Sequence, residues 1–112
     1  MTEGIIEFAD WEKVDLRVAE IKEVEEIPGS DKLYKLSVDV GAEIRTICAG
    51  IKPYYKKEEL KNKKIIVVVN LAPRKLLGIT SQGMLLAASN PEHTKVILLS
   101  PEKDIEAGSN VR

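Results

Sequence analysis

The chain has very little of what most active sites and membrane anchors are made from. Among its 112 residues there are one cysteine, one histidine, one tryptophan and one phenylalanine. No apolar run approaches the roughly 20 residues that span a bilayer. The N-terminal stretch MTEGIIEFADWEK lacks the basic flank and the long apolar stretch of a signal peptide. We therefore expect a cytoplasmic protein without a membrane segment.

The scarcity of cysteine and histidine argues against catalysis. A lone Cys48 forms no internal disulfide and no clustered zinc site, and its apolar context, EIRTICAGI, indicates a buried side chain. His93 lies in SNPEHTK, a polar stretch typical of an exposed loop. A catalytic triad needs an oriented base, and a metal site usually needs three or four ligands. We predict no catalytic residues, no metal and no cofactor, so binding is the expected kind of function.

The charge is nearly balanced overall but unevenly distributed. The formal net charge is −1, yet residues 1–30 hold 3 Lys/Arg and 9 Asp/Glu, whereas residues 31–75 hold 11 and 5. A cationic middle third is consistent with one basic face. A solvated, lysine-rich surface of a heat-adapted protein explains the same counts, and composition does not separate the two.

The chain has no Gly/Ser linker, low-complexity segment or internal repeat, which indicates one domain. We expect an N-terminal extension at residues 1–9 and the folded domain at residues 10–112. The segment Phe8–Lys13 predicts one short helical turn, with Asp10 as its N-cap.

Strand periodicity dominates the first half of that domain. Apolar and polar residues alternate from Val14 and then fall out of phase, which predicts a strand with a bulge or bend near Glu20. After a turn at residues 28–31, a second strand is expected at Tyr34–Val40, with its core face on the Tyr34 side, and a third at Ile44–Ala49. These three strands predict an antiparallel meander.

A short helix and further strands follow. The segment KKEELKNKK after Pro53 contains good helix formers but is too short for more than about two turns. The β-branched run Lys64–Val69 predicts a strand buried on both faces, and further strands are expected at Met84–Ala88 and Val96–Leu99, ahead of a polar tail. This order predicts an all-β OB-fold, a five-stranded Greek-key barrel with a short helix between strands three and four and an extra C-terminal strand or tail.

The stretch NLAPRKLLGITSQGMLLAA at residues 70–88 carries more polar and basic residues than a simple turn requires. Arg74 and Lys75 can neutralise phosphates, and Asn70 and Ser81 can hydrogen-bond to base or sugar edges. Taken singly, such residues are better explained as strand caps, turn formers and solvated cations. Together they favour an RNA-binding loop.

The same stretch, together with VDLRVAEI, SDKLYKLSVDVG and RTICAGI, resembles the tRNA-binding domain family. The resemblance runs from about Asp10 to Arg112, with the motifs in the family's order. It implies an OB-fold that binds tRNA by shape, often near the outer corner of the L. Within the family, the chain is most similar to the domain at the C-terminus of methionyl-tRNA synthetases, or encoded separately as their β subunit. Such domains are typically homodimers that pair through the chain termini and barrel edges.

The resemblance also implies a set of tRNA-binding residues that line one face. They match the family's NL-PRK---S-GM signature and basic positions on neighbouring strands, and they are Asn70, Arg74, Lys75, Ser81, Gly83, Met84, Lys32, Lys35 and Arg45. Met84 is either an apolar platform for a base or ribose or, more simply, a core residue. Leu77 stands where many relatives place a further cation. With few aromatic residues near this face, recognition by backbone and shape is expected rather than extensive base stacking.

The expected function is that of a non-catalytic module that docks tRNA for a methionyl-tRNA synthetase. A basic face would engage the phosphates, and a dimer or a tethered catalytic subunit would raise the effective concentration. One alternative is a synthetase-associated interaction module whose protein partner matters more than tRNA. Another is an export-type chaperone that resembles the same family and binds unfolded peptides in an apolar groove.

Overall fold

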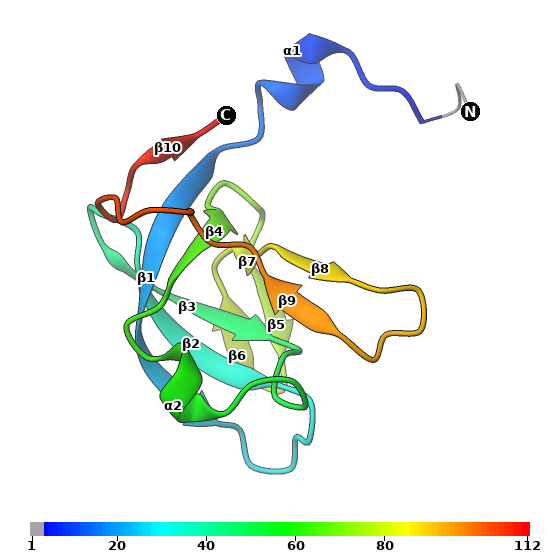
Figure 1. Ribbon diagram of the computed structural model, residues 1–112, viewed down its shortest axis with the longest axis vertical. Helices are drawn as coiled ribbons and strands as arrows, with labels where there is room; N and C mark the ends of the chain where they lie inside the picture. Colours follow the sequence, from blue (N-terminus) through cyan, green and yellow to red (C-terminus); the bar gives the residue numbers. More distant parts are fainter. Residues whose placement is uncertain (1–3) are drawn as a thin grey trace.

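Antiparallel strands form most of the regular secondary structure (Figure 1), and the computed structural model describes residues 4–112. The elements, in chain order, are α1 (Phe8–Trp11), β1 (Leu16–Glu26), β2 (Tyr34–Asp39), β3 (Ile44–Ala49), α2 (Lys57–Leu60), β4 (Lys64–Val68), β5 (Arg74–Leu76), β6 (Ile79–Ser81), β7 (Met84–Leu85), β8 (Ala87–Ser89), β9 (Val96–Leu98) and β10 (Asn110–Val111). Neither helix in the described residues is long and apolar enough to cross a membrane.

Five strands form a nearly closed barrel. They are hydrogen-bonded in the order β3-β2-β1-β4-β7, and every pair is antiparallel. The outer edge of β3 is then covered by the chain just before β7, because Gln82 N–H donates to Thr46 O at 2.8 Å and Thr46 N–H donates to the Gln82 side chain at 3.1 Å. With α2 between β3 and β4, this arrangement confirms the predicted OB-fold.

The core lies inside this barrel and continues through β4. Ile65 and Val67 belong to the main cluster of buried side chains, whereas Ile66 points into a second cluster with Leu16 and Val18 of β1. The continuous apolar run of this segment is therefore buried on both faces, as predicted. The predicted core face of β2 is also confirmed, since Tyr34 and its alternate neighbours are buried.

The first strand differs from the prediction at two points. It begins at Leu16, because Val14 lies outside the ladder with 39% of its surface exposed. The register of β1 against β2 shifts between Ile21 and Glu23, slightly beyond the bulge expected near Glu20. The extra residue there allows both Ile21 and Val24 to face the main cluster.

Both helices are short, as predicted, but the first is capped differently from the prediction. The predicted turn is present as α1, but Glu7 holds its N-cap position and Asp10 lies inside the helix. The helix α2 has only four residues, about one turn, and its single buried side chain is Leu60. In Figure 1, α1 lies away from the barrel, beyond the N-terminal end of β1.

The predicted fifth strand is divided in two. Met84 and Leu85 pair with β4 as β7, and after Leu86 the chain pairs with β9 as β8 in a separate hairpin. Leu86 is bonded to both neighbours, because its N–H donates to Ile66 O and its carbonyl oxygen accepts from Leu99 N–H. Figure 1 shows the β8–β9 hairpin projecting to one side of the barrel.

The C-terminal tail returns to β1. Its last strand, β10, pairs with the start of β1, as the expected extra strand or tail allows. Lys64 holds the tail on its way, since the ammonium donates to Asp104 at 2.9 Å and also to the backbone oxygen of Ile105. This ion pair raises the pKa of Lys64 and lowers the pKa of Asp104.

Candidate nucleic-acid interface

The stretch singled out in the sequence contains a small hairpin. Strands β5 and β6 pair with Arg74 opposite Ser81, and the two turn residues, Leu77 and Gly78, have φ angles of 51° and 79°. Two consecutive positive φ angles are typical of a type I′ turn, which matches the twist of the strands it joins. The sequence indicated a loop here because the first turn position is usually asparagine or glycine, not leucine.

The hairpin is attached to β3 through Ser81. The Ser81 hydroxyl accepts a hydrogen bond from Cys48 N–H at 3.0 Å and donates one to Gly83 O at 3.2 Å. Ser81 is only 3% exposed, and Cys48 beside it is fully buried, which raises the pKa of its thiol. The structure thus places the predicted RNA-binding hydroxyl inside the protein, where it joins the hairpin to the barrel.

Gly83 and Met84 lie where the stretch re-enters the barrel. Gly83 has a φ of 126°, and a Cβ added to it would lie 2.6 Å from Val68 O, so only glycine fits there. Met84 pairs with Val68 in the ladder and is half-buried. Both residues set the path of the chain between the hairpin and β7.

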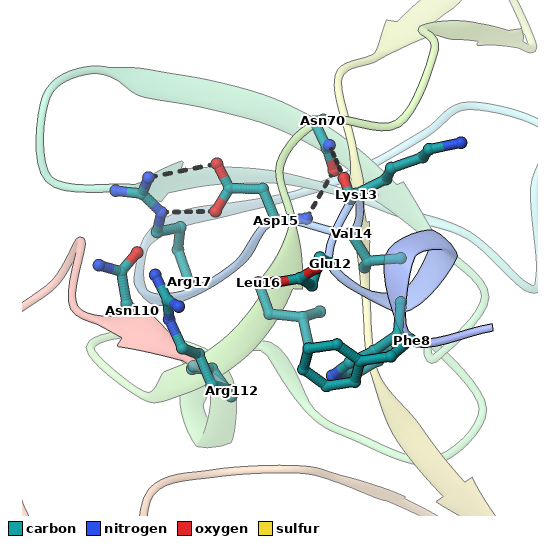
Figure 2. A pocket seen from close by; sticks show the side chains of 12 residues that line it. Phe8, Glu12, Lys13, Val14, Asp15, Leu16, Arg17, Asn70, Asn110 and Arg112 are labelled. Carbon is teal, nitrogen blue, oxygen red and sulfur yellow. Dashed lines mark hydrogen bonds and ion pairs between the residues drawn. The ribbon is translucent and has the colours of Figure 1, made fainter.

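Asn70 and Arg45 also make contacts within the chain. The Asn70 amide accepts a hydrogen bond from Asp15 N–H at 2.8 Å and donates one to Lys13 O (Figure 2). The Arg45 guanidinium donates to Glu43 at 3.1 Å and to Val69 O. These two predicted residues therefore fasten the chain around the end of β4.

Four of the predicted cations form no ion pair within residues 4–112. They are Lys32, Lys35, Arg74 and Lys75, and all but the half-buried Lys35 are exposed. Seven other basic residues do have such a partner, among them Arg45 with Glu43. The four ammonium and guanidinium groups are thus available to an anion from outside.

These cations come from neighbouring elements of one region. Arg74 pairs with Ser81 across the hairpin, Ser81 bonds to Cys48 on β3, and Cys48 pairs with Lys35 on β2. The positive charge of Lys35 acts on the Cys48 thiol, where it opposes the effect of burial on the pKa. The hairpin and the β2–β3 pair therefore present their cations from adjacent strands.

Lys32 and Lys75 line a common groove between the β1–β2 loop and the hairpin. Its walls are residues 29–33, then Gly50, Pro53 and Tyr54, then residues 75–77. We call it the hairpin groove. Tyr54 was not among the predicted residues, because a tyrosine after a proline gives no periodic signal and its position in the groove depends on the tertiary fold.

A second, more polar pocket lies at the N-terminal segment (Figure 2). Phe8 and Trp11 of α1 line it together with Asn110 and Arg112 at the C-terminus. Beside them, the Arg17 guanidinium donates to both Asp15 carboxylate oxygens, at 2.7 and 3.2 Å, which raises the pKa of Arg17. This pocket thus lies between residues 8–17 and the C-terminal residues 110–112.

Metal ligation finds no support in the described part of the chain, residues 4–112. No group of three or more His, Cys, Asp and Glu side chains there could hold an ion. The arrangement that stands out chemically is the set of unpaired cations around the hairpin groove.

Comparison with protein families and curated sequences gives consistent matches. Residues 16–110 match the family model described as "Putative tRNA binding domain". A methionine--tRNA ligase from Caldanaerobacter subterraneus subsp. tengcongensis is 58% identical over 106 residues, which are 95% of this chain. The chain spans only 16% of that relative's length.

Solved structures match over nearly the whole chain. A MetRS-related protein from Pyrococcus horikoshii superposes with a TM-score of 0.90 at 39% identity, covering 96% of this chain and 98% of that one. The chaperone CsaA from Bacillus anthracis superposes with a TM-score of 0.87 at 28% identity, covering 97% and 100%. The overall fold described above is thus shared with a protein named as a MetRS relative and with a protein named as a chaperone.

Proposed function

The chain belongs to the tRNA-binding domain family, and from this we propose that it is a non-catalytic module that docks tRNA through one basic face of its barrel. The observation that carries the proposal is that four cations from neighbouring elements, Lys32, Lys35, Arg74 and Lys75, form no ion pair within residues 4–112. Phosphates are their natural ligands, and releasing the counterions of the RNA drives such binding.

The other predicted residues have supporting parts in this proposal. Arg45 and Asn70 hold the end of β4, and Ser81 and Gly83 hold the hairpin against β3 and β4. Met84 is half-buried in the ladder, so at most one side of it is accessible to RNA. We assign phosphate contact to the four cations and positioning to these five residues.

The partner served by this docking is proposed to be a methionyl-tRNA synthetase. The support is the 58% identity to a methionine--tRNA ligase over 95% of this chain. Binding of tRNA by an attached or associated module raises the effective concentration at the catalytic site without contributing to the chemistry.

A homodimer is part of the same proposal. The N-terminal segment carries apolar side chains in solvent, with exposed fractions of 72% for Ile5, 61% for Ile6 and 71% for Phe8. Pairing two copies through this segment would bury that surface and place two basic faces on one assembly. Sedimentation should give a dimer that Phe8→Ser weakens and Ile97→Ser, a control on β9 with 56% exposure, does not. A monomeric wild-type protein would contradict it.

Salt dependence tests the docking itself. With about four phosphate contacts, affinity for unfractionated tRNA should fall roughly 10²–10³-fold between 50 and 300 mM salt, and each cation-to-alanine change should reduce the logarithmic slope by about one. Lys103→Ala is the matched control, since Lys103 is exposed and has no ion pair in the described chain. Affinity that hardly changes with salt, or with Arg74→Ala plus Lys75→Ala, would refute the proposal.

Peptide binding is the second candidate, and the likeness to CsaA favours it. The groove has an apolar wall that includes Leu33, Leu76 and Leu77. A competition assay separates the two functions. Stoichiometric displacement of tRNA by an unfolded peptide would show that peptide binds this face, whereas tRNA binding unaffected by peptide would count against peptide binding there.

A further inference from the structure

The walls of the hairpin groove differ from a simple phosphate-binding surface. Besides its two lysines, the groove is lined by Leu33, Leu76 and Leu77 and by the ring of Tyr54. A sugar-phosphate backbone is too polar to pack well against such side chains. The face of an unstacked base packs well there, because bases turned out of a helix stack on aromatic and apolar side chains.

Leu77 occupies the most unusual place in the groove. It has a φ of 51°, a left-handed conformation that disfavours non-glycine residues by roughly 1–2 kcal/mol. Its side chain is nevertheless 61% exposed at the tip of the hairpin, beside the groove that it lines. A strained, exposed leucine gains nothing from the core of this protein, which points to a contact with a bound molecule.

Tyr54 is held in position before any ligand binds. Its hydroxyl donates to His93 O at 3.1 Å, which ties the ring to the β8–β9 hairpin. Tyr54 is half-buried and lines the groove together with Leu77 at the tip of β5–β6. An anchored ring loses little conformational freedom when a base stacks on it.

The charges of the groove complement a nucleotide. Lys32 stands on the β1–β2 loop and Lys75 on β5, so the groove has a cation on each side. Asp31 is the one acidic residue among the lining side chains, which leaves a net positive charge. Phosphates on either side of an inserted base would thus each find an ammonium group.

We propose that the hairpin groove takes one unpaired nucleotide of the bound RNA, with its base between Tyr54 and Leu77 and its flanking phosphates at Lys32 and Lys75. This inference rests on the proposed function and adds to it a preference for RNA in which a nucleotide is turned out of the helix. Contacts with the remaining cations do not need such a nucleotide.

The test compares two RNA probes, a blunt-ended duplex and the same duplex with one bulged nucleotide. Wild-type protein should bind the bulged duplex about tenfold more tightly, in line with the effect of one base stacked on an aromatic residue. Tyr54→Ala and Leu77→Asn should each remove most of this preference while keeping the affinity for the blunt duplex. Tyr54→Phe retains the ring and should keep the preference.

Leu77→Asn also serves as a control against loss of the bulge preference through unfolding of the protein. Asparagine tolerates the left-handed turn position better than leucine, so the melting temperature should rise while the preference falls. Equal affinity of wild-type protein for both probes, or a preference that survives Tyr54→Ala, overturns the inference but leaves the salt-dependent docking intact. The inference is also overturned if an unfolded apolar peptide displaces the bulged duplex from wild-type protein and Leu77→Asn abolishes this displacement. If wild-type protein binds neither probe nor tRNA, the docking function itself fails.

Discussion

The side-chain oxygen of Asn70 accepts a hydrogen bond from the backbone N–H of Asp15, 55 residues earlier in the chain, at 2.8 Å. Its amide nitrogen donates to Lys13 O, so one side chain spans the backbone on both sides of Val14. The adjacent bond from Val69 N–H to Asp15 O completes the attachment. Asn70 therefore holds the segment that carries α1 against the end of β4.

Replacing Asn70 with alanine should loosen this segment. Both bonds are lost, and we expect a decrease of about 1 kcal/mol in the free energy of unfolding. Hydrogen exchange at the Asp15 amide should accelerate markedly, while exchange in β2 and β3 stays unchanged. Asn70→Asp keeps the acceptor and loses the donor, so its free energy of unfolding should lie between those of the wild type and the alanine variant. Unchanged protection of Asp15 in the alanine variant would show that Asn70 does not hold the segment.

Ser81→Ala separates a structural hydroxyl from an RNA contact. The change leaves the buried Cys48 N–H without its acceptor, which should lower the free energy of unfolding by about 1–3 kcal/mol. Because the hydroxyl is buried, tRNA affinity of the folded protein should stay within about twofold of wild type, measured well below the melting temperature. A large loss of affinity with no loss of stability would return Ser81 to the set of direct contacts.

The barrel strands were predictable because alternation and β-branching follow burial directly. The run at Lys64–Val69 became β4, with Ile65 and Ile66 in two different clusters. The β5–β6 hairpin was not predictable in this way, because Leu77 occupies a turn position where asparagine or glycine is the usual signal of a hairpin. Local signals thus predict an element only when its residues are the usual ones.

The partners of polar side chains were harder to predict than the strands. Asn70 and Ser81 attracted attention because they can hydrogen-bond to RNA, but the same groups serve backbone atoms 55 and 33 residues away. A side chain's capacity to bond is a local property, whereas its partner depends on which distant segment the fold brings near. The cations were predictable in kind, and only the structure shows which of them lack ion-pair partners among residues 4–112.

Two glycines of the stretch offer a matched pair of substitutions. Gly83 and Gly78 both have positive φ, but an added Cβ meets Val68 O at Gly83 and nothing within 4 Å at Gly78. Gly78→Ala should cost about 1 kcal/mol for the backbone conformation alone. Gly83→Ala adds a clash with β4, and we expect a loss of about 2–4 kcal/mol by urea denaturation. Equal losses of unfolding free energy in the two variants would mean that β7 shifts enough to relieve the clash with β4.

The ion pair between Lys64 and Asp104 makes the anchorage of the C-terminal tail dependent on pH. The hydrogen bond from Lys64 lowers the pKa of Asp104 from its ordinary value of 3.8. A carboxyl group whose pKa is lower in the folded state stabilises the protein above its ordinary pKa, and this contribution disappears as the pH falls through the lowered value. Lys64, whose pKa is raised from 10.5, stays protonated throughout the acid range.

Asp104→Asn should therefore be less stable than wild type near neutral pH and equal to it in strong acid. Urea denaturation between about pH 2 and pH 7 should show a difference that closes only below the ordinary pKa of 3.8. Glu102→Gln, an exposed neighbour with no ion pair in the described chain, should show no such closing difference. Because Asp104 is exposed, the effect should be small and should shrink with added salt. A difference that persists unchanged at pH 2 would mean that Asp104 stabilises the tail through something other than its charge.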